Sequence, residues 1–148
     1  MSTWAHVYGI ILIDGIPGNE TDPLAHFTVT RIQNILGPIA KWNDLMRDTN
    51  SQKACKLPMG SEGSLEYRII EYDRGFPWLS IPIWGDLRDV DEFDYIKNWW
   101  ETLIKEFNEK NYPIRGAVMK IDIEGQPSLI LHEASVYEKE EYSGKNPT

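Results

Sequence analysis

The amino-acid sequence predicts a single-domain α+β sandwich, in which two main helices lie on one face of a mostly antiparallel sheet. Three observations lead to this prediction. Segments with strand-like alternation and segments with helical spacing follow in the order strand, helix, two strands, helix, two strands. The 148 residues suffice for one domain with a core and are short for two. About 41% of the residues are apolar, as in folded globular chains.

The first strand is expected over residues 6–14, HVYGIILID, which are rich in β-branched residues and end at turn residues. A helix is expected over residues 24–36, with Thr21 or Asp22 as its N-cap and Pro23 at its first position. Its apolar residues fall close to one helical face: Leu24, Phe27, Ile32, Ile35 and Leu36. The TVT triplet inside this segment forms helices poorly, so whether the whole segment is helical stays open.

The Gly-Pro pair at 37–38 ends this helix. Residues 39–46 are expected as a short helical piece or an irregular cover, and residues 47–64 as a long loop. A loop of this length inside a compact domain is either mobile or functional.

Two strands are expected over residues 64–73 and 78–87, with the turn RGFP between them. The first of them alternates, and three of its residues face one way: Leu65, Tyr67 and Ile69. Pro82 removes a ladder donor from the second strand, which predicts an edge strand or a bulge there.

The second helix is expected to start within an acidic run and to end near Asn111. The acidic run consists of Asp86, Asp89, Asp91, Glu92 and Asp94. Apolar residues recur in it at intervals of three and four: Phe93, Ile96, Trp100, Leu103 and Phe107. Asp89 as N-cap would place Glu92 at the third helical position, and Asp91 as N-cap would place Asp94 there. The acidic run is therefore interpreted as the start of a helix, where carboxylates also interact favourably with the helix dipole.

A hairpin is expected over residues 114–134, with EGQP as its turn. This order of strands and helices suggests a ferredoxin-like arrangement, because each helix can cross over between strands that are not neighbours. The predicted organisation is one domain over residues 1–135 and a charged, flexible C-terminal tail over residues 136–148.

The net charge is −8 and the pI about 4.8. Such a chain repels nucleic acid on average, so no direct nucleic-acid contact is expected. An acidic surface instead suits a basic protein partner, although the charge also keeps a chain soluble. A disulfide within the chain and a thiolate metal cage are both excluded, because Cys55 is the single cysteine. The sequence indicates a cytoplasmic protein with no signal peptide and no membrane segment.

The sequence contains no known catalytic or metal-binding motif. A helix-loop-helix calcium site fails in the acidic run, because a start at Asp86 or at Asp89 puts apolar or basic residues at ligand positions. The three histidines are scattered without zinc-binding spacing. The stretch GSEGS at 60–64 lacks the lysine of a phosphate-binding loop and is interpreted as a turn. We therefore expect no cofactor, no metal and no enzymatic activity.

Seven residues are the candidates for a binding surface. They are the exposed carboxylates, the Gly-Ser loop and two tryptophans: Asp86, Asp89, Asp91, Ser61, Glu62, Trp78 and Trp84. Trp78 and Trp84 are six residues apart and fall on the same side of a strand. If that side is the open face of the sheet, it is a platform for a partner or for a homodimer.

Three segments resemble parts of small accessory proteins encoded by bacteriophages. They are LPMGSEGSLEYRI, IWGDLRDVDEFDYIKNWW and IRGAVMKIDIEG, and with the opening strand the resemblance spans about residues 57–125. It includes no catalytic motif. It implies a small acidic protein in the cytoplasm of a bacterial host cell that binds and blocks a host protein, including components of antiviral defence.

The leading hypothesis is therefore a non-enzymatic acidic binding protein that inhibits a host or bacterial protein by occluding its surface. The second is a protein that sequesters a small ligand such as a nucleotide signal, which requires a pocket with convergent polar groups. The third is a hydrolase that uses Cys55 or a carboxylate, and Cys55 could act as a nucleophile only if the fold brought one of the three histidines to it.

Overall fold

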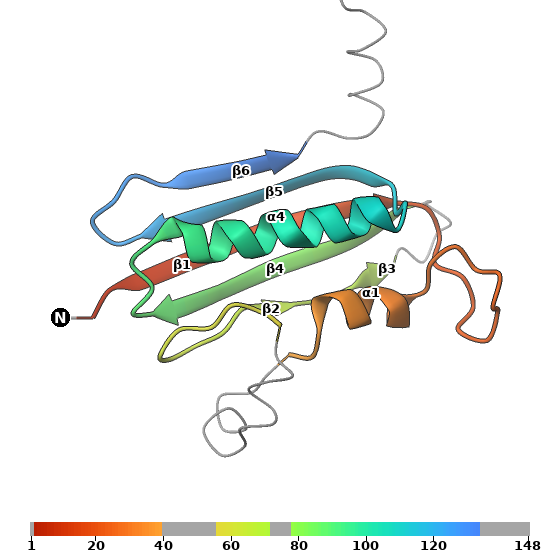
Figure 1. Cartoon of the computed structure of the whole chain (residues 1–148), viewed down its shortest axis with the longest axis horizontal. Helices are drawn as coiled ribbons and strands as arrows, with labels where there is room; N and C mark the ends of the chain where they lie inside the picture. Colours follow the sequence, from red (N-terminus) through yellow and green to blue (C-terminus); the bar gives the residue numbers. More distant parts are fainter. Residues whose placement is uncertain (1, 40–55, 72–77, 134–148) are drawn as a thin grey trace, which may run out of the picture.

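The computed structural model describes residues 2–39, 56–71 and 78–133, and within them it has the predicted α+β class (Figure 1). In chain order the elements are β1 Trp4–Asp14, α1 Val29–Leu36, β2 Glu66–Tyr67, β3 Ile70–Glu71, β4 Trp78–Arg88, α4 Phe93–Glu109, β5 Ile114–Ile123 and β6 Leu129–Glu133. The six strands form one sheet in the order β2-β4-β1-β5-β6, with β3 also on β4. Every pair of neighbouring strands is antiparallel.

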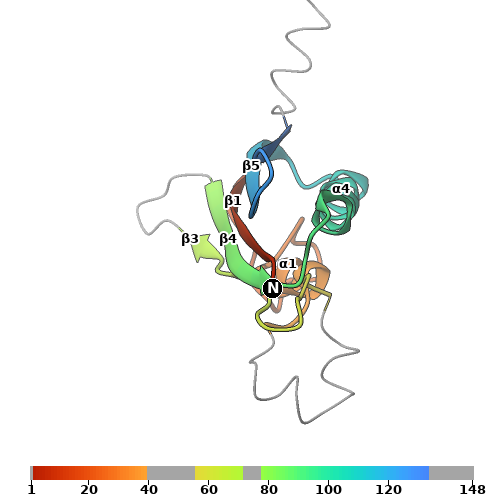
Figure 2. The same ribbon diagram turned by 90° about the vertical axis from the view of Figure 1, so that its left-hand side faces the viewer.

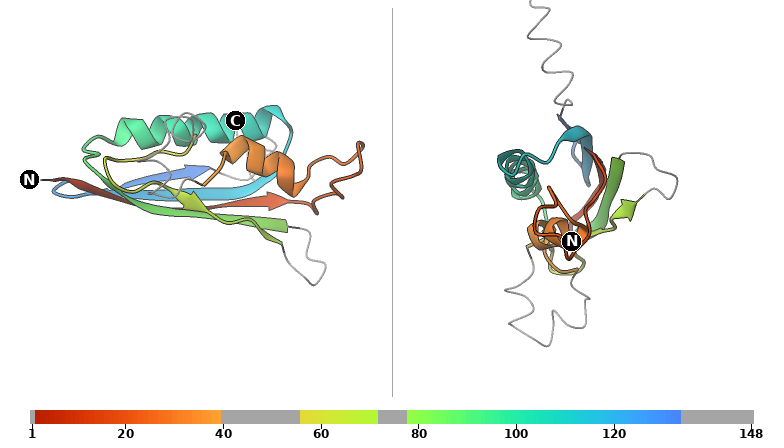
Figure 3. Two further views of the ribbon diagram at one scale, coloured as in Figure 1. Left: turned by 90° about the horizontal axis from the view of Figure 1, so that it is seen from below. Right: turned by 90° about the vertical axis from the view of Figure 1, so that its right-hand side faces the viewer.

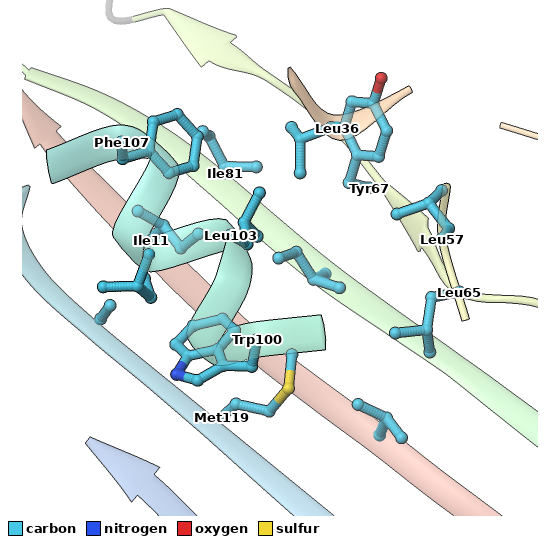
Figure 4. Close-up of a cluster of buried hydrophobic side chains, with 14 of the residues drawn as sticks. Ile11, Leu36, Leu57, Leu65, Tyr67, Ile81, Trp100, Leu103, Phe107 and Met119 are labelled. Atoms are coloured by element: carbon cyan, nitrogen blue, oxygen red, sulfur yellow. The ribbon is translucent and has the colours of Figure 1, made fainter. Parts of the chain in front are cut away.

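Both helices lie on the same face of the sheet (Figures 2 and 3). Strand residues alternate between this face and the other one, so the odd-numbered residues of β1 and β4 turn toward the helices. The apolar stripe of α4 packs on them, and Figure 4 shows Trp100, Leu103 and Phe107 in one cluster with Ile11 and Ile81. The core of the described residues therefore lies on the helix side of the sheet, and loop residues such as Leu57 and Leu65 also contribute to it.

The first helix is shorter than predicted and begins five residues later, at Val29. Thr28 is its N-cap, and its hydroxyl oxygen accepts from the amide of Arg31 at 3.2 Å. The expected N-caps Thr21 and Asp22 and the expected start at residue 24 are wrong. Asp22 instead accepts from the amide of Leu24 in a turn. Threonine is poor inside a helix and good at its N-cap, so the TVT triplet marks the start of the helix.

The predicted strand over residues 64–73 appears as two short strands, β2 and β3, which share one register on β4. Glu66 lies opposite Trp84 and Ile70 lies opposite Ser80, so the break between them falls opposite Pro82. The amide of Arg68 donates to the Pro82 carbonyl at 3.1 Å, and Pro82 has no N–H to return the bond. The prediction of an edge strand or a bulge is therefore wrong, because β4 has neighbours on both sides and its register does not shift.

The second helix also begins later than expected, with Glu92 at the N-cap and no side-chain hydrogen bond there. The predicted capping by Asp89 or Asp91 is wrong. Asp89 lies in the left-handed region at φ 61°, and its carboxylate accepts from the Ser61 hydroxyl at 2.5 Å. Of the acidic run, Asp94 alone lies in the first helical turn.

The C-terminal hairpin is confirmed, with its turn between Ile123 and Leu129 and the amide of Gln126 bonded to the Ile123 carbonyl at 3.0 Å. The remaining expectations fall on residues 40–55, 72–77 and 134–148, which lie outside the described residues. These include most of the piece at 39–46, Cys55, the RGFP turn and the tail.

Candidate functional site

The face of the sheet opposite the helices is not covered by any element of the described residues (Figure 2). It is formed by even-numbered residues of β1, β4, β6 and, from Gly116 to Asp122, of β5. We call it the open face. Apolar side chains stand on it with large exposed fractions: Tyr8 48%, Trp84 38%, Val118 39% and Ile130 62%. An exposed apolar surface that crosses several strands is typical of a protein interface.

Strand register sorts the open face into rows that cross the sheet. Trp84, Tyr8, Lys120 and Ile130 lie opposite one another in a row on β4, β1, β5 and β6. The next row holds Pro82, Ile10, Val118 and His132. Together these two rows place an apolar band across the middle of the sheet.

Charged residues flank this band on the side of the β5–β6 turn. Asp122 accepts from the hydroxyl of Tyr8 at 3.3 Å and from that of Ser128, and Lys120 Nζ lies 3.8 Å from its carboxylate. The Ser128 hydrogen bond, with the Lys120 ammonium, lowers the pKa of Asp122 below its usual range. The Tyr8 hydroxyl, followed by the Asp122 carboxylate, raises the pKa of Lys120. Both groups are therefore ionised at neutral pH.

His6 is a residue of the open face that the sequence did not single out. Its Nδ1 lies 2.6 Å from a carboxylate oxygen of Asp86, and its Nε2 lies 3.9 Å from Glu124. The pair forms because the β1–β4 register sets residue 6 opposite residue 86. Because the two residues are 80 positions apart in the sequence, no local pattern indicates this contact.

Arg115 occupies the other end of the open face. Its guanidinium lies 3.4 Å from the carboxylate of Asp14 and 5.5 Å from the centre of the Trp78 ring. Trp78 and Trp84 thus lie on the same face of β4, as their spacing predicts. Trp78 is half-buried at this end, and Trp84 stands in the apolar band.

Charges on the three central strands of the open face nearly cancel. Each carboxylate there has a partner within the face: Asp14 with Arg115, Asp86 with His6, and Asp122 with Lys120. With His6 neutral, the net charge of these six residues is −1, so seven of the eight net negative charges of the chain lie elsewhere.

The other predicted binding residues meet at the end of β4. Ser61 donates to Asp89, and Arg88 Nη1 lies 2.5 Å from Glu62. The turn around Ser61 follows the backbone of β4 closely, with the Ser61 amide bonded to the Arg88 carbonyl at 2.9 Å. GSEGS is thus a turn, as predicted, and its polar groups are used within the fold. Asp91 lines a shallow hollow of about 380 Å³ beside it.

A second hollow of about 620 Å³ lies at the C-terminus of α1. Lys56 and Arg68 contribute cations to its lining, and Tyr67 and Ile69 contribute apolar surface. Lys56 Nζ donates to the Asn34 carbonyl at 3.1 Å, so its charge already interacts with the negative end of the helix.

No catalytic or metal-binding constellation is found in the parts of the chain that the structure describes. His6 contacts the carboxylates of Asp86 and Glu124, and His26 Nε2 lies 2.8 Å from the Asn111 carbonyl. No group of three or more His, Cys, Asp or Glu in these parts could hold a metal ion. The described helices are all too short or too polar to cross a bilayer.

No protein-family model, no curated protein and no solved structure matches this chain. The open face is therefore the strongest candidate for a functional site, on the evidence of the structure alone.

Proposed function

We propose that this chain is a non-enzymatic protein-binding protein that acts by occupying a surface on another protein. One observation carries the proposal: among the residues that the structure describes, helices lie on one face of the sheet only, and the other face displays large apolar side chains. Monomeric proteins rarely leave such a band uncovered, since exposed apolar surface is costly in water.

The composition of the open face favours a protein partner over a small molecule. Its band is made of side chains that dominate protein interfaces, including the aromatic residues Trp84 and Tyr8. A small ligand needs a concave pocket that surrounds it, and a sheet face is broad. The partner surface that fits is apolar at its centre and carries both signs of charge around it. The acidic remainder of the chain would speed encounter with a basic partner.

An inhibitor of a host protein is the form of this function that we propose. The resemblance of residues 57–125 to bacteriophage accessory proteins supports it, and it suggests a bacterial protein, including a component of antiviral defence, as the target. Occlusion of a surface requires no chemistry from the inhibitor. The cytoplasm of the bacterial host is the compartment that goes with this proposal.

A ferredoxin-like topology is part of the same proposal. Its support is the strand order β5-β1-β4-β2, in which each helix crosses between strands that are not neighbours, with β6 added beside β5. Folds of this kind leave one sheet face free of helices, which is the surface that the proposal uses.

The experiment is capture of proteins from a bacterial lysate by the tagged full chain and by three variants. Trp84→Glu places a charge in the apolar band and should abolish capture of a specific partner. Leu24→Glu is the matched control, because Leu24 is 90% exposed on a loop away from the open face. Capture that survives both Trp84→Glu and Ile130→Glu would contradict the use of this surface.

Sequestration of a small ligand, such as a nucleotide signal, is the second candidate, and the hollow at the end of α1 favours it. Arg68 and Lys56 could contact phosphate there, although the helix carbonyl beside Lys56 opposes an anion. Calorimetry with cyclic nucleotides tests this: binding that Arg68→Ala weakens about tenfold or more would support it. No heat with any of them would remove it.

A further inference from the structure

We propose that, in the absence of its target, the open face is covered by the open face of a second copy, related by a two-fold axis. This inference rests on the proposed function, since it takes the open face to be a protein interface. The inference adds a second copy of the chain that competes with the target for the open face. Three features of the face argue for a second copy: its size, its charge and its register.

The open face has the size that a stable dimer needs. β1 and β4 have 11 residues each and β5 has 10, in a sheet five strand positions wide. Such a sheet measures roughly 35 by 24 Å. Because the outer strands are shorter, the face covers on the order of 700 Å² per copy, close to the ~800 Å² per partner of standard interfaces.

The open face also avoids the repulsion that two acidic chains would otherwise meet. Each copy carries −8, but the six paired residues that the three central strands place on this face sum to −1 with His6 neutral. Two such faces can approach at little electrostatic cost, whereas contact through the rest of the surface would bring like charges together.

The register of the strands makes the face complementary to itself. The row of Pro82, Ile10 and Val118 lies midway between the His6 row and the Asp14 end of the face. A two-fold axis along this middle row sets Ile10 against Ile10 and Val118 against Val118 of the second copy. The centre of the interface is then apolar, as in stable homodimers.

The same axis turns each β5 onto β5 of the second copy in the opposite direction. Asp122 of one copy, four residues from Val118, then lies near Arg115 of the other, three residues from Val118 in the opposite direction, and Lys120 lies over Gly116. Nothing stands within 4 Å of the place where a side chain at Gly116 would be, so the lysine has room. Stacked sheets cross at about 30°, which separates the strand ends, so a long side chain such as Arg115 is needed to reach across.

The test measures the oligomeric state of the full chain by sedimentation over a range of concentrations. We expect a reversible dimer. Arg115→Asp and Asp122→Arg should each weaken it at least about tenfold, because a two-fold dimer contains the pair twice. The double variant restores opposite charges and should regain most of the affinity. Lys105→Glu, on the helix side of the molecule, is the matched charge reversal and should change nothing.

Two results would overturn the inference. The first is a monomer at every concentration, and the second is a double variant as weak as the two single changes combined. Thermal unfolding of each variant shows whether the change acts on the fold instead of the interface. A monomer that still captures a partner in a Trp84-dependent way would assign the open face to that partner, and the proposed function would stand. A monomer that captures nothing would contradict both.

Discussion

At the scale of single residues, the carboxylates of the acidic run have separate structural roles. Asp86 contacts His6 on the open face, and Asp89 accepts from Ser61 at the end of β4. Asp94 lies in the first turn of α4, where its charge stabilises the helix. Five acidic positions close in sequence therefore do not converge on one ligand. They lie on a strand, in a left-handed turn and in a helix, so their side chains do not point to one place.

Tyr67 makes a buried hydrogen bond whose loss can be measured. Its hydroxyl donates to the Gly37 carbonyl at 2.7 Å, and the side chain is 6% exposed. Tyr67→Phe should lower the free energy of unfolding by about 1–2 kcal/mol, because the carbonyl is left buried without its donor. Chemical denaturation at neutral pH measures this. An unchanged midpoint would show that water replaces the hydroxyl.

The same residue predicts a pH dependence in the alkaline range. Burial raises the pKa of Tyr67 above its ordinary value of 10.0, so the phenol ionises more readily in the unfolded chain. Its contribution to stability is then complete below about pH 10 and is lost as the pH rises through the pKa of the folded state. The difference in unfolding free energy between the natural chain and Tyr67→Phe should therefore shrink above pH 10. A difference that grows with pH would contradict the sign.

At the scale of elements, α4 lacks a side-chain cap, and this can be corrected by substitution. Glu92 has extended backbone angles at the N-cap, but its side chain makes no capping hydrogen bond. Glu92→Asp keeps the charge and provides the shorter acceptor that N-caps favour, so it should stabilise the fold by about 0.5–1 kcal/mol. Thermal unfolding measures it.

Asp91→Glu is the reciprocal control for this change. Asp91 lies one residue before the N-cap, and its backbone carbonyl accepts from Gln126 at 2.9 Å. We expect no change in stability, since the substitution keeps the charge and the carbonyl. A loss as large as that of a missing cap would mean that Asp91 caps the helix after all.

The turn at residues 60–63 depends on the close approach of two backbones. Gly63 has φ 79°, and a Cβ there would overlap the carbonyl oxygen of Asp86. Gly125 has φ 80° but open space around it. Gly63→Ala should therefore cost about 3 kcal/mol or more, and Gly125→Ala about 1 kcal/mol, because the second pays for the backbone angle alone. Equal losses in urea denaturation would show that the turn can move away from β4.

At the scale of the whole molecule, the two faces of the sheet differ in burial. The helix face contains the core, and its substitutions should act on stability. The open face carries the more exposed side chains, and if it is the proposed interface, substitutions of those side chains should act on association. Substitution of one tryptophan on each face can distinguish an effect on stability from an effect on association.

Trp100 is 2% exposed between α4 and the sheet, and Trp84 is 38% exposed on the open face. Trp100→Ala should lower the free energy of unfolding by about 3–5 kcal/mol. Trp84→Ala should lower it by about 1 kcal/mol or less and should weaken partner capture. Denaturation and capture on the same preparations check both, and a large loss of stability from Trp84→Ala would mean that this face belongs to the core.

The sequence by itself determined what depends on near neighbours along the chain. Strand and helix periodicity, the stop at Gly37 and the turn at 60–64 are local properties, and they were predicted correctly. Where local rules competed, prediction failed. Thr28 is the N-cap of α1, although its low helix propensity suggested only a weak helix residue. Pro82 suggested an edge strand or a bulge, because the sequence does not show which neighbouring strand its missing N–H would face.

Only the tertiary structure decided the candidate site. His6 meets Asp86, and Asp14 meets Arg115, because antiparallel pairing brings together residues far apart in sequence. The common side of Trp78 and Trp84 could be predicted, but whether helices would cover that side could not. A strand with apolar residues on both faces has the same sequence pattern whether its second face is covered or exposed to solvent. Both described helices lie on the other side of the sheet, and Trp84 is exposed while Trp78 is half-buried.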